Sequence, residues 1–270
     1  MTQAFDSRPI GVFDSGVGGL TVLNALVQRL PEENFIYLGD TARVPYGTKS
    51  ALTVARYASQ VTEALVKRDV KSIVVACNTA SALGMDTLQT QFNLPVLGVI
   101  DPGCKTALSY SKNNKIGIIG TRSTIASNAY PNRLRHFKPG IMAISLACPL
   151  FVPLAEEGWV EHPSTEMIIA ETLKPLIGSD IDTLILGCTH YPILKSKIQQ
   201  FLSDKIHLVD SALALADQLY EQLNHAIQPA TKGNKQQLTF LSTDAGERFR
   251  EVAERFLPGL TVKQVERIDL

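Results

Sequence analysis

Short apolar runs alternate along this chain with segments whose apolar residues recur at helical spacing. The first run, 10–13, is followed by Leu20, Leu23, Val27 and Leu30, which fall on one face of a helix. Further apolar runs predict strands at 35–38, 73–76, 96–100, 116–121, 141–146, 184–186 and 238–241. Alternation of strands and helices predicts mainly parallel sheets that are covered by helices on both faces.

The order of these elements repeats in the second part of the chain. Residues 116–121 resemble residues 10–15, and the apolar run before Cys188 resembles the run before Cys77. Similar order and spacing predict two related α/β halves, each a doubly wound, mainly parallel sheet, in a pseudo-twofold relation. The alternative is that any α/β protein shows such an alternation.

A polar break at 111–115 separates the two halves. The last predicted elements form a tail that is too small for a domain, with a strand at 238–241, a helix at 246–256 and a strand near 260–265. We expect this tail to complete the first sheet. The predicted domains are 1–98 with 208–270 for the first, which carries Cys77, and 99–207 for the second, which carries Cys188. The ligand site is expected in the cleft between them.

Composition narrows the classes of protein. Hydrophobic residues make up 45% and charged residues 19% of the 270 residues, which suits an ordinary folded core. Lysine plus arginine and aspartate plus glutamate number 26 each, so the formal net charge is zero. A balanced charge argues against a large nucleic-acid footprint, and we predict no nucleic-acid partner.

Targeting signals are not evident in the sequence. Residues 1–8 lack a basic segment followed by an apolar one. The most apolar stretch, 141–155, is shorter than a membrane span and contains Pro149 and Pro153, so we expect a core strand followed by a loop. These features predict a cytoplasmic protein with no membrane contact and with its four cysteines reduced. The sequence has no C-x-x-C pair, which argues against a thioredoxin-like redox site or a zinc ribbon.

Two cysteines occupy matched settings. Cys77 ends the apolar run 72–76, Cys188 ends the run 183–187, and a helix is predicted to begin after each. In open parallel sheets, ligands bind at the carboxyl ends of the strands. Two thiols at such positions in related halves suggest paired acid/base groups that serve one pocket, one on each face of a carbon centre.

The neighbours of these thiols favour chemistry over simple packing. The start of a helix stabilises a thiolate and so lowers the pKa of a thiol. Asn78 and Thr79 offer hydrogen-bond donors beside Cys77, and His190 could orient Cys188 or exchange a proton with it. The alternatives are that the cysteines are small core residues and that His190 caps a helix or packs. No metal site is predicted, because the sequence reveals no further ligands beside Cys188 and His190.

Glycine-rich and hydroxyl-rich segments fall at the same predicted sheet edges. The glycines of 14–19 let the backbone approach a ligand, and the amides of a helix start favour an anion. This segment is neither the dinucleotide fingerprint nor a P-loop, and Asp14 disfavours a polyphosphate, so a carboxylate or an amino acid is predicted. Tyr46 and Gly47 follow the second strand, and 120–124 occupies the equivalent strand end of the second half. Each could hold a ligand, form a turn or cap a helix.

As an ordered set, these motifs resemble the glutamate racemases of the aspartate/glutamate racemase superfamily over nearly the whole chain. The segments that carry the resemblance are 10–19, 39–47, 76–80, 120–124, 148–158 and 187–192. The resemblance implies an isomerase that converts L-glutamate to D-glutamate by two-base proton transfer, without a cofactor. It also implies glutamate as the small-molecule substrate, a supply of D-glutamate for peptidoglycan synthesis, and a homodimer.

The resemblance also implies roles for individual residues. Cys77 would take the α-proton of D-glutamate, and Cys188 that of L-glutamate. Asp14 would assist Cys77, and His190, supported by Glu157, would assist Cys188. The residues implied in holding the carboxylates and the ammonium are Asp14, Ser15, Tyr46, Gly47, Asn78, Thr79, Thr121, Thr124, Thr189 and His190.

Three other functions stay open from the residues alone. An aspartate racemase of the same superfamily would differ in pocket length, which the sequence does not reveal. A non-catalytic two-domain protein that binds amino acids would explain the cleft and the glycine turns, but not a thiol on each side. A structural protein would bury both thiols, and they would react slowly with alkylating reagents.

Overall fold

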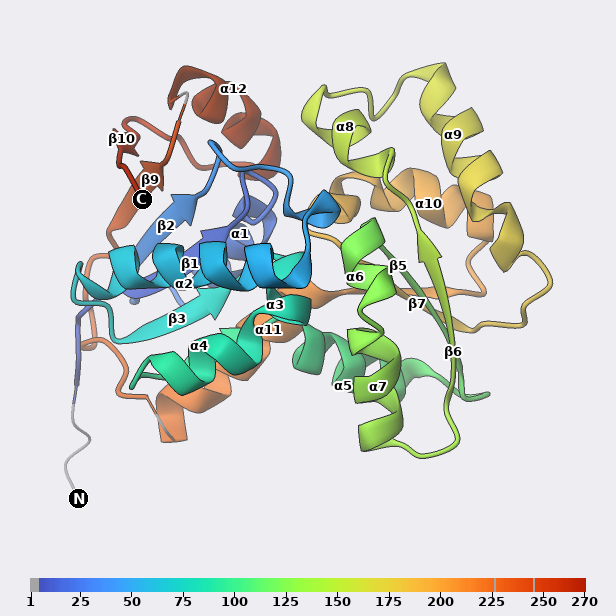
Figure 1. The fold of residues 1–270 in the computed structure, drawn as a ribbon, viewed down its shortest axis with the longest axis horizontal. Coiled ribbons are helices and arrows are strands. Elements are labelled where there is room, and N and C mark those ends of the chain that lie inside the picture. The colour runs from blue at the N-terminus through green and yellow to red at the C-terminus, as the bar shows by residue number, and fades with distance from the viewer. Residues whose placement is uncertain (1–4, 226, 245) are drawn as a thin grey trace.

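The computed structural model describes residues 5–225, 227–244 and 246–270. Its strands form two separate sheets (Figure 1). The strands of the first sheet are β1 (Ile10–Asp14), β2 (Phe35–Gly39), β3 (Ser72–Val75), β4 (Val96–Gly98), β9 (Leu238–Ser242) and β10 (Glu266–Arg267). Those of the second are β5 (Lys115–Gly120), β6 (Met142–Ala147), β7 (Thr183–Gly187) and β8 (His207–Asp210). Neighbouring strands pair in parallel throughout, which confirms the predicted fold class.

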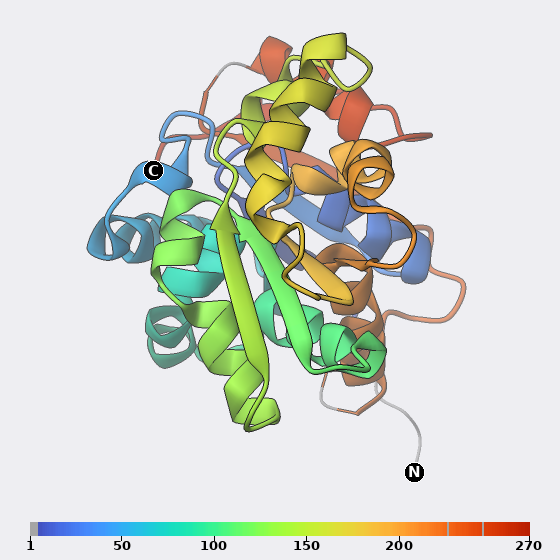
Figure 2. The same cartoon turned by 90° about the vertical axis from the view of Figure 1, so that its right-hand side faces the viewer.

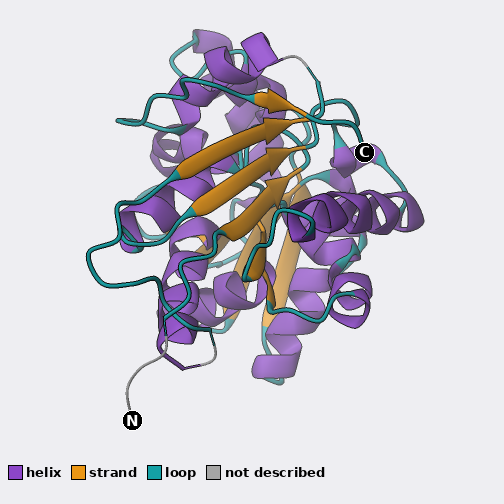
Figure 3. Ribbon diagram, turned by 90° about the vertical axis from the view of Figure 1, so that its left-hand side faces the viewer, coloured by secondary structure: helices purple, strands orange, loops and turns teal. Residues whose placement is uncertain are grey.

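Helices lie on both sides of the sheets (Figures 2 and 3). Helices that pack around the first sheet are α1 (Leu20–Arg29), η1 (Tyr46–Thr48), α2 (Ala51–Val66), α3 (Asn78–Leu83), α4 (Met85–Gln91), α11 (Ser211–His225) and α12 (Gly246–Phe256). Those around the second are α5 (Ile100–Tyr110), α6 (Arg122–Ala126), α7 (Ala129–Phe137), α8 (Phe151–Glu156), α9 (Pro163–Leu173), η2 (Lys174–Leu176), η3 (Tyr191–Leu194) and α10 (Lys195–Leu202). Within the described ranges, no helix is long and apolar enough to cross a membrane.

The continuous apolar runs in the sequence are strands that are buried on both faces. Side chains alternate across a strand, so neighbouring residues of β1 face opposite layers. Val12 packs in one core cluster with Leu23 of α1, while Phe13 packs in another with Val61 of α2. All five residues of β1 are buried, as expected for a central parallel strand.

The two sheets share one strand order. Strands β2-β1-β3-β4 of the first sheet correspond to β6-β5-β7-β8 of the second. In this correspondence β3, which leads to Cys77, is equivalent to β7, which leads to Cys188. The tail strand β9 adds to the first sheet beside β2, as the sequence predicted.

Several boundaries differ from the sequence predictions. The strand expected at 96–100 ends at Gly98, and α5 begins at Ile100, because Pro102 suits a first helical turn. The last strand lies at 266–267 rather than near 260–265. Strand β8 pairs with β7, so 208–210 belong to the second sheet and the chain returns to the first half only after Asp210. The predicted domain ranges therefore cut through the start of β8.

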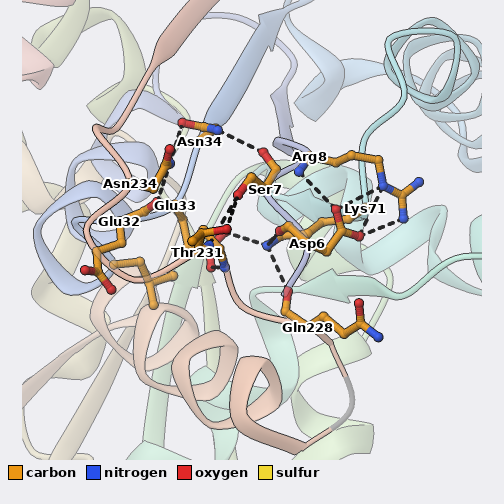
Figure 4. Close-up of polar contacts among 12 residues, drawn as sticks. Asp6, Ser7, Arg8, Glu32, Glu33, Asn34, Lys71, Gln228, Thr231 and Asn234 are labelled. Atoms are coloured by element: carbon orange, nitrogen blue, oxygen red, sulfur yellow. Dashed lines mark hydrogen bonds and ion pairs between the residues drawn. The ribbon is translucent and has the colours of Figure 1, made fainter. Parts of the chain in front are cut away.

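A buried polar cluster lies at the end of the first sheet that is opposite Cys77 (Figure 4). Lys71 Nζ lies 2.6 Å from Glu33 Oε2 and donates to the carbonyl oxygens of Asp6, at 2.7 Å, and Gln228, at 2.9 Å. Glu33 Oε1 accepts from the amide of Ala230 at 2.7 Å. The pair links the segment before β1, the turn before β2 and the loop before β9.

Candidate active site

Side chains from both halves line one cavity of about 150 Å³ at the carboxyl ends of the strands. The expected site residues that line it are Ser15, Tyr46, Gly47, Cys77, Asn78, Thr79, Thr121, Cys188, Thr189 and His190. Asp14, Thr124 and Glu157 do not line it. The cavity wall also contains residues that were not among the expected site residues: Val44, Pro45, Thr48, Arg122, Pro149, Val152 and Pro153.

Cys77 lies between β3 and α3, buried and part of the first half. Its Sγ accepts from the amide of Ala80 at 3.4 Å and lies 3.7 Å from Ser15 Oγ. Burial, followed by the charge of Asp14, raises the pKa of the Cys77 thiol to about 12. The expectation of a lowered pKa was wrong for this thiol, because one short helix does not outweigh removal from water. At neutral pH Cys77 is therefore a protonated thiol.

Asp14 ends β1 just behind Cys77 and is almost fully buried. Its Oδ2 accepts from the amide of Gly16 at 3.1 Å. Burial raises the pKa of the Asp14 carboxyl, although the charge of His190 and the nearby amides oppose this shift. Asp14 and Cys77 are therefore two buried titratable groups that lie beside each other.

Cys188 lies at the equivalent position after β7 and has a different companion. Its Sγ is 3.7 Å from His190 Nδ1, and His190 Nε2 is 2.8 Å from Glu156 Oε1. Burial alone would lower the pKa of His190, but the hydrogen bonds to Cys188 and Glu156 outweigh it and raise the pKa to about 10. The protonated imidazole of His190 places a positive charge beside the sulfur of Cys188.

The carboxylate that supports His190 is Glu156, one residue before the Glu157 that the resemblance implied. Glu157 instead pairs with Arg248 at 2.8 Å near the surface. Glu156 is the last residue of helix α8, and Glu157 follows it at the C-terminal cap. Adjacent residues on a helix point in different directions, so Glu156 faces inward and Glu157 outward.

A cluster of hydroxyl groups joins the two halves next to the thiols. Thr79 Oγ1 lies 3.0 Å from both Thr121 Oγ1 and Thr124 Oγ1, which are 2.9 Å from each other. Thr121 also caps α6, since its Oγ1 accepts from the amide of Thr124 at 3.3 Å. Thr121 therefore caps a helix, and it also lines the cavity, where it could hold a ligand.

Tyr46 and Gly47 bring a segment of the first half against α6. The buried Tyr46 hydroxyl donates to the carboxylate of Asp40, which anchors the short helix η1. A Cβ atom at Gly47 would lie 2.7 Å from Thr121 Cβ, closer than real side chains come. Glycine is required here by the contact between the halves.

The buried side chain of Asn78 has one paired and one unpaired hydrogen-bonding group. Its Oδ1 accepts from the Tyr130 hydroxyl at 2.6 Å. Its Nδ2 has no hydrogen-bond partner among the residues that the structure describes. Buried amide groups are nearly always paired, so an unpaired donor in a cavity wall points to an acceptor on a ligand.

Metal ligation has no support in the part of the chain that the structure describes. No group of three or more His, Cys, Asp or Glu side chains is arranged there to hold an ion. The nearest pair, Cys188 and His190, is bonded internally and to Glu156.

Sequence comparison shows what the chain is similar to. The model of the Asp/Glu/Hydantoin racemase family matches residues 10–219. A glutamate racemase of Syntrophus aciditrophicus is 47% identical over 265 residues, which make up 97% of each protein.

Solved structures give the same result. Glutamate racemase isoform RacE1 of Bacillus anthracis superimposes with a TM-score of 0.94 at 39% identity, covering 97% of this chain and 98% of that one. Glutamate racemase of Francisella tularensis, solved in complex with D-glutamate, gives a TM-score of 0.92 at 39% identity and covers 98% of both chains.

Proposed function

The chain belongs to the Asp/Glu/Hydantoin racemase family, and from that membership we propose that it interconverts L- and D-glutamate without a cofactor. The observation that carries the proposal is that Cys77 and Cys188 line one cavity from different halves. We further propose that the protein acts in the cytoplasm and supplies D-glutamate for peptidoglycan synthesis.

Inversion of the α-carbon needs a base on one face and an acid on the other. From L-glutamate, the Cys188 thiolate takes the α-proton, so the C–H bond breaks as an S–H bond forms. The Cys77 thiol then gives its proton to the opposite face, which forms the new C–H bond and leaves a thiolate. The reverse reaction uses the same groups in exchanged roles.

The surroundings of the two thiols suit their proposed roles, with Cys188 as the base and Cys77 as the acid. The raised pKa of Cys77 keeps it protonated, as a proton donor must be. The raised pKa of His190 keeps an imidazolium 3.7 Å from Cys188 Sγ, and we propose that it stabilises the negative charge on this sulfur during proton transfer. The two thiols therefore meet the substrate with different neighbours, a carboxyl at Cys77 and an imidazolium at Cys188.

Binding groups surround the two thiols. We propose that Asn78, Thr79, Thr121 and Thr189 donate to the carboxylates of glutamate, and that the amides of Ser15 and Gly47 join them. The α-proton of an amino acid is a far weaker acid than a thiol, so these donors must also stabilise the carbanion-like transition state. Exclusion of water from so small a cavity strengthens them.

The test is incubation with L-glutamate in deuterium oxide, with no cofactor added. We expect optical rotation to decay as deuterium replaces the α-proton. D-aspartate and L-aspartate serve as comparison substrates. Turnover of aspartate alone would move the assignment to an aspartate racemase, and binding of glutamate without exchange would favour the non-catalytic alternative.

A further inference from the structure

Tyr130 is a buried side chain that the proposed chemistry leaves without a role. It lies on α7 of the second half and is only 1% exposed. Its hydroxyl reaches across to the first half and donates to Asn78 Oδ1 at 2.6 Å. Asn78 follows Cys77 directly in the chain, so Tyr130 contacts the residue next to one proposed catalytic thiol.

The ring of Tyr130 is held between two backbone segments. A Cβ atom at Gly187, the residue before Cys188, would lie 3.2 Å from Tyr130 Cε2. A Cβ atom at Gly103 of α5 would lie 3.7 Å from Tyr130 Cε1. The backbone of Gly187 therefore lies against one edge of the ring and that of Gly103 lies near the other edge, where a side chain at Gly187 would crowd the ring.

This contact decides which end of the Asn78 amide faces the cavity. The oxygen and nitrogen of an amide are nearly equal in size, so hydrogen-bond partners set its orientation. Burial raises the pKa of the Tyr130 phenol and so keeps it protonated. The phenol donates its proton to Asn78 Oδ1, and Asn78 Nδ2 is left as the free donor.

We propose that Tyr130 is a positioning residue that fixes the Asn78 amide with Nδ2 toward the cavity, ready to donate to a substrate carboxylate. The identity of that carboxylate as glutamate rests on the proposed function. Without the phenolic hydroxyl the amide can turn, and a turned amide would present Oδ1 to the carboxylate and repel it. Tyr130 would thus act on substrate affinity through Asn78.

The first test is Tyr130→Phe, which removes only the hydroxyl. We expect KM for glutamate to rise about tenfold in both directions with kcat little changed, since the lost contact serves substrate and transition state alike. Tyr191→Phe is the matched control: its equally buried hydroxyl donates to the backbone oxygen of Cys148 at 2.8 Å and orients no side chain. An equal rise of KM in the control would assign the effect to general loosening and overturn the proposal.

A double-mutant cycle separates positioning from packing. In an Asn78→Ala background, Tyr130→Phe should change KM less than twofold, because the amide through which it acts is gone. Independent, multiplying losses would contradict the proposal. The asparagine side-chain amide resonances of isotope-labelled protein give a readout without turnover. The Asn78 pair should shift in Tyr130→Phe and stay in place in Tyr191→Phe, even if glutamate proves not to be the substrate; an unmoved pair would overturn the proposal.

Discussion

At the scale of single residues, the two thiols are equivalent in place and unequal in surroundings. Cys77 has a buried carboxyl, Asp14, behind it, and Cys188 has an imidazole, His190, within 3.7 Å. Burial, followed by the charge of Asp14, raises the pKa of the Cys77 thiol, whereas Cys188 lies beside a protonated imidazole. The two faces of the cavity are therefore chemically distinct before any substrate binds.

Replacing either thiol should stop racemisation. In Cys77→Ala and in Cys188→Ala one of the two proton-transfer groups is missing, so we expect kcat to fall at least about a hundredfold in both directions. Polarimetry with each glutamate enantiomer measures the loss. Cys104→Ala and Cys148→Ala remove buried thiols outside the proposed chemistry and should keep turnover largely intact. Full turnover by either single variant of the first pair would exclude the two-base assignment.

His190 should make stability depend on pH in a defined window. Its pKa rises from 6.5 to about 10 in the folded protein, so its stabilising effect is complete below 6.5 and is lost as the pH rises toward 10. The free energy of unfolding should fall by up to about 1.4 kcal/mol per pH unit in that window. Denaturant titrations between pH 6.5 and 9.0 measure the slope of the unfolding free energy against pH. The range stops at 9.0 because the Cys77 thiol begins to titrate there in the unfolded chain.

Two neighbouring glutamates provide the control for this titration. Glu156→Gln removes a charge that His190 contacts at 2.8 Å, and the slope should become shallower. Glu157→Gln removes a charge that contacts Arg248 at the surface, and the slope should stay as in the unchanged protein. Equal slopes in all three proteins would show that Glu156 does not hold the proton on His190.

At the scale of elements, strand ends were the most predictable features and helix faces the least. Uninterrupted apolar runs such as 183–187 are typical of buried parallel strands, and they located both cysteines at the sheet edge. Helix α8 was missed because Pro149 and Pro153 suggested a loop, although Pro153 lies in the first turn, where proline is tolerated. The assignment of Glu157 to His190 came from the family resemblance, and the contact is made by the neighbouring Glu156.

Contacts between elements of different halves were beyond prediction from local pattern. The hydrogen bond from Tyr130 to Asn78 joins residues that are far apart in the chain, and no spacing rule connects them. The hydroxyl cluster of Thr79, Thr121 and Thr124 is another example. The sequence indicated which segments reach the cleft, but not which side chains meet there.

The contact between η1 and α6 should be sensitive to a single methyl group. In Gly47→Ala the new Cβ would lie 2.7 Å from Thr121 Cβ, so α6 must move away and widen the cavity. Strain of this kind costs about 1–3 kcal/mol, and we expect kcat/KM to fall more than about tenfold. Gly246→Ala adds the same methyl with its nearest neighbour at 3.9 Å and should leave kcat/KM unchanged. An unaffected Gly47→Ala enzyme would show that this contact does not shape the site.

At the scale of the whole molecule, the chain crosses between its halves twice. A buried ion pair far from the cavity stabilises the first half. Lys71 and Glu33 form an ion pair whose side chains are 1% and 5% exposed, and they join three segments of the first half. Breaking a buried pair by removing one partner leaves the other charge unpaired in a medium that cannot solvate it. The ion pair therefore holds together three segments at the end of the first sheet that is opposite Cys77.

Lys71→Met should therefore destabilise the protein by about 3–5 kcal/mol, measured by denaturant unfolding. Adding Glu33→Gln should restore part of the loss, because it removes the stranded charge. The control is Lys67→Met, which breaks an exposed ion pair: the side chain of Lys67 is 72% exposed and that of Glu63 is 55% exposed. This change should alter the free energy of unfolding by less than about 1 kcal/mol. A loss in Lys71→Met no larger than in Lys67→Met would rule out a structural role for the buried pair.

The shared strand order of the two sheets has a consequence for how such an enzyme can originate. A half-length ancestor with one cysteine after its third strand could pair with a copy of itself and place two identical thiols across a groove. Fusion of the two genes would then let each thiol evolve its own companion, an aspartate on one side and a histidine on the other. The present chain, with Cys77 and Cys188 after equivalent strands, has the form that such a history would leave.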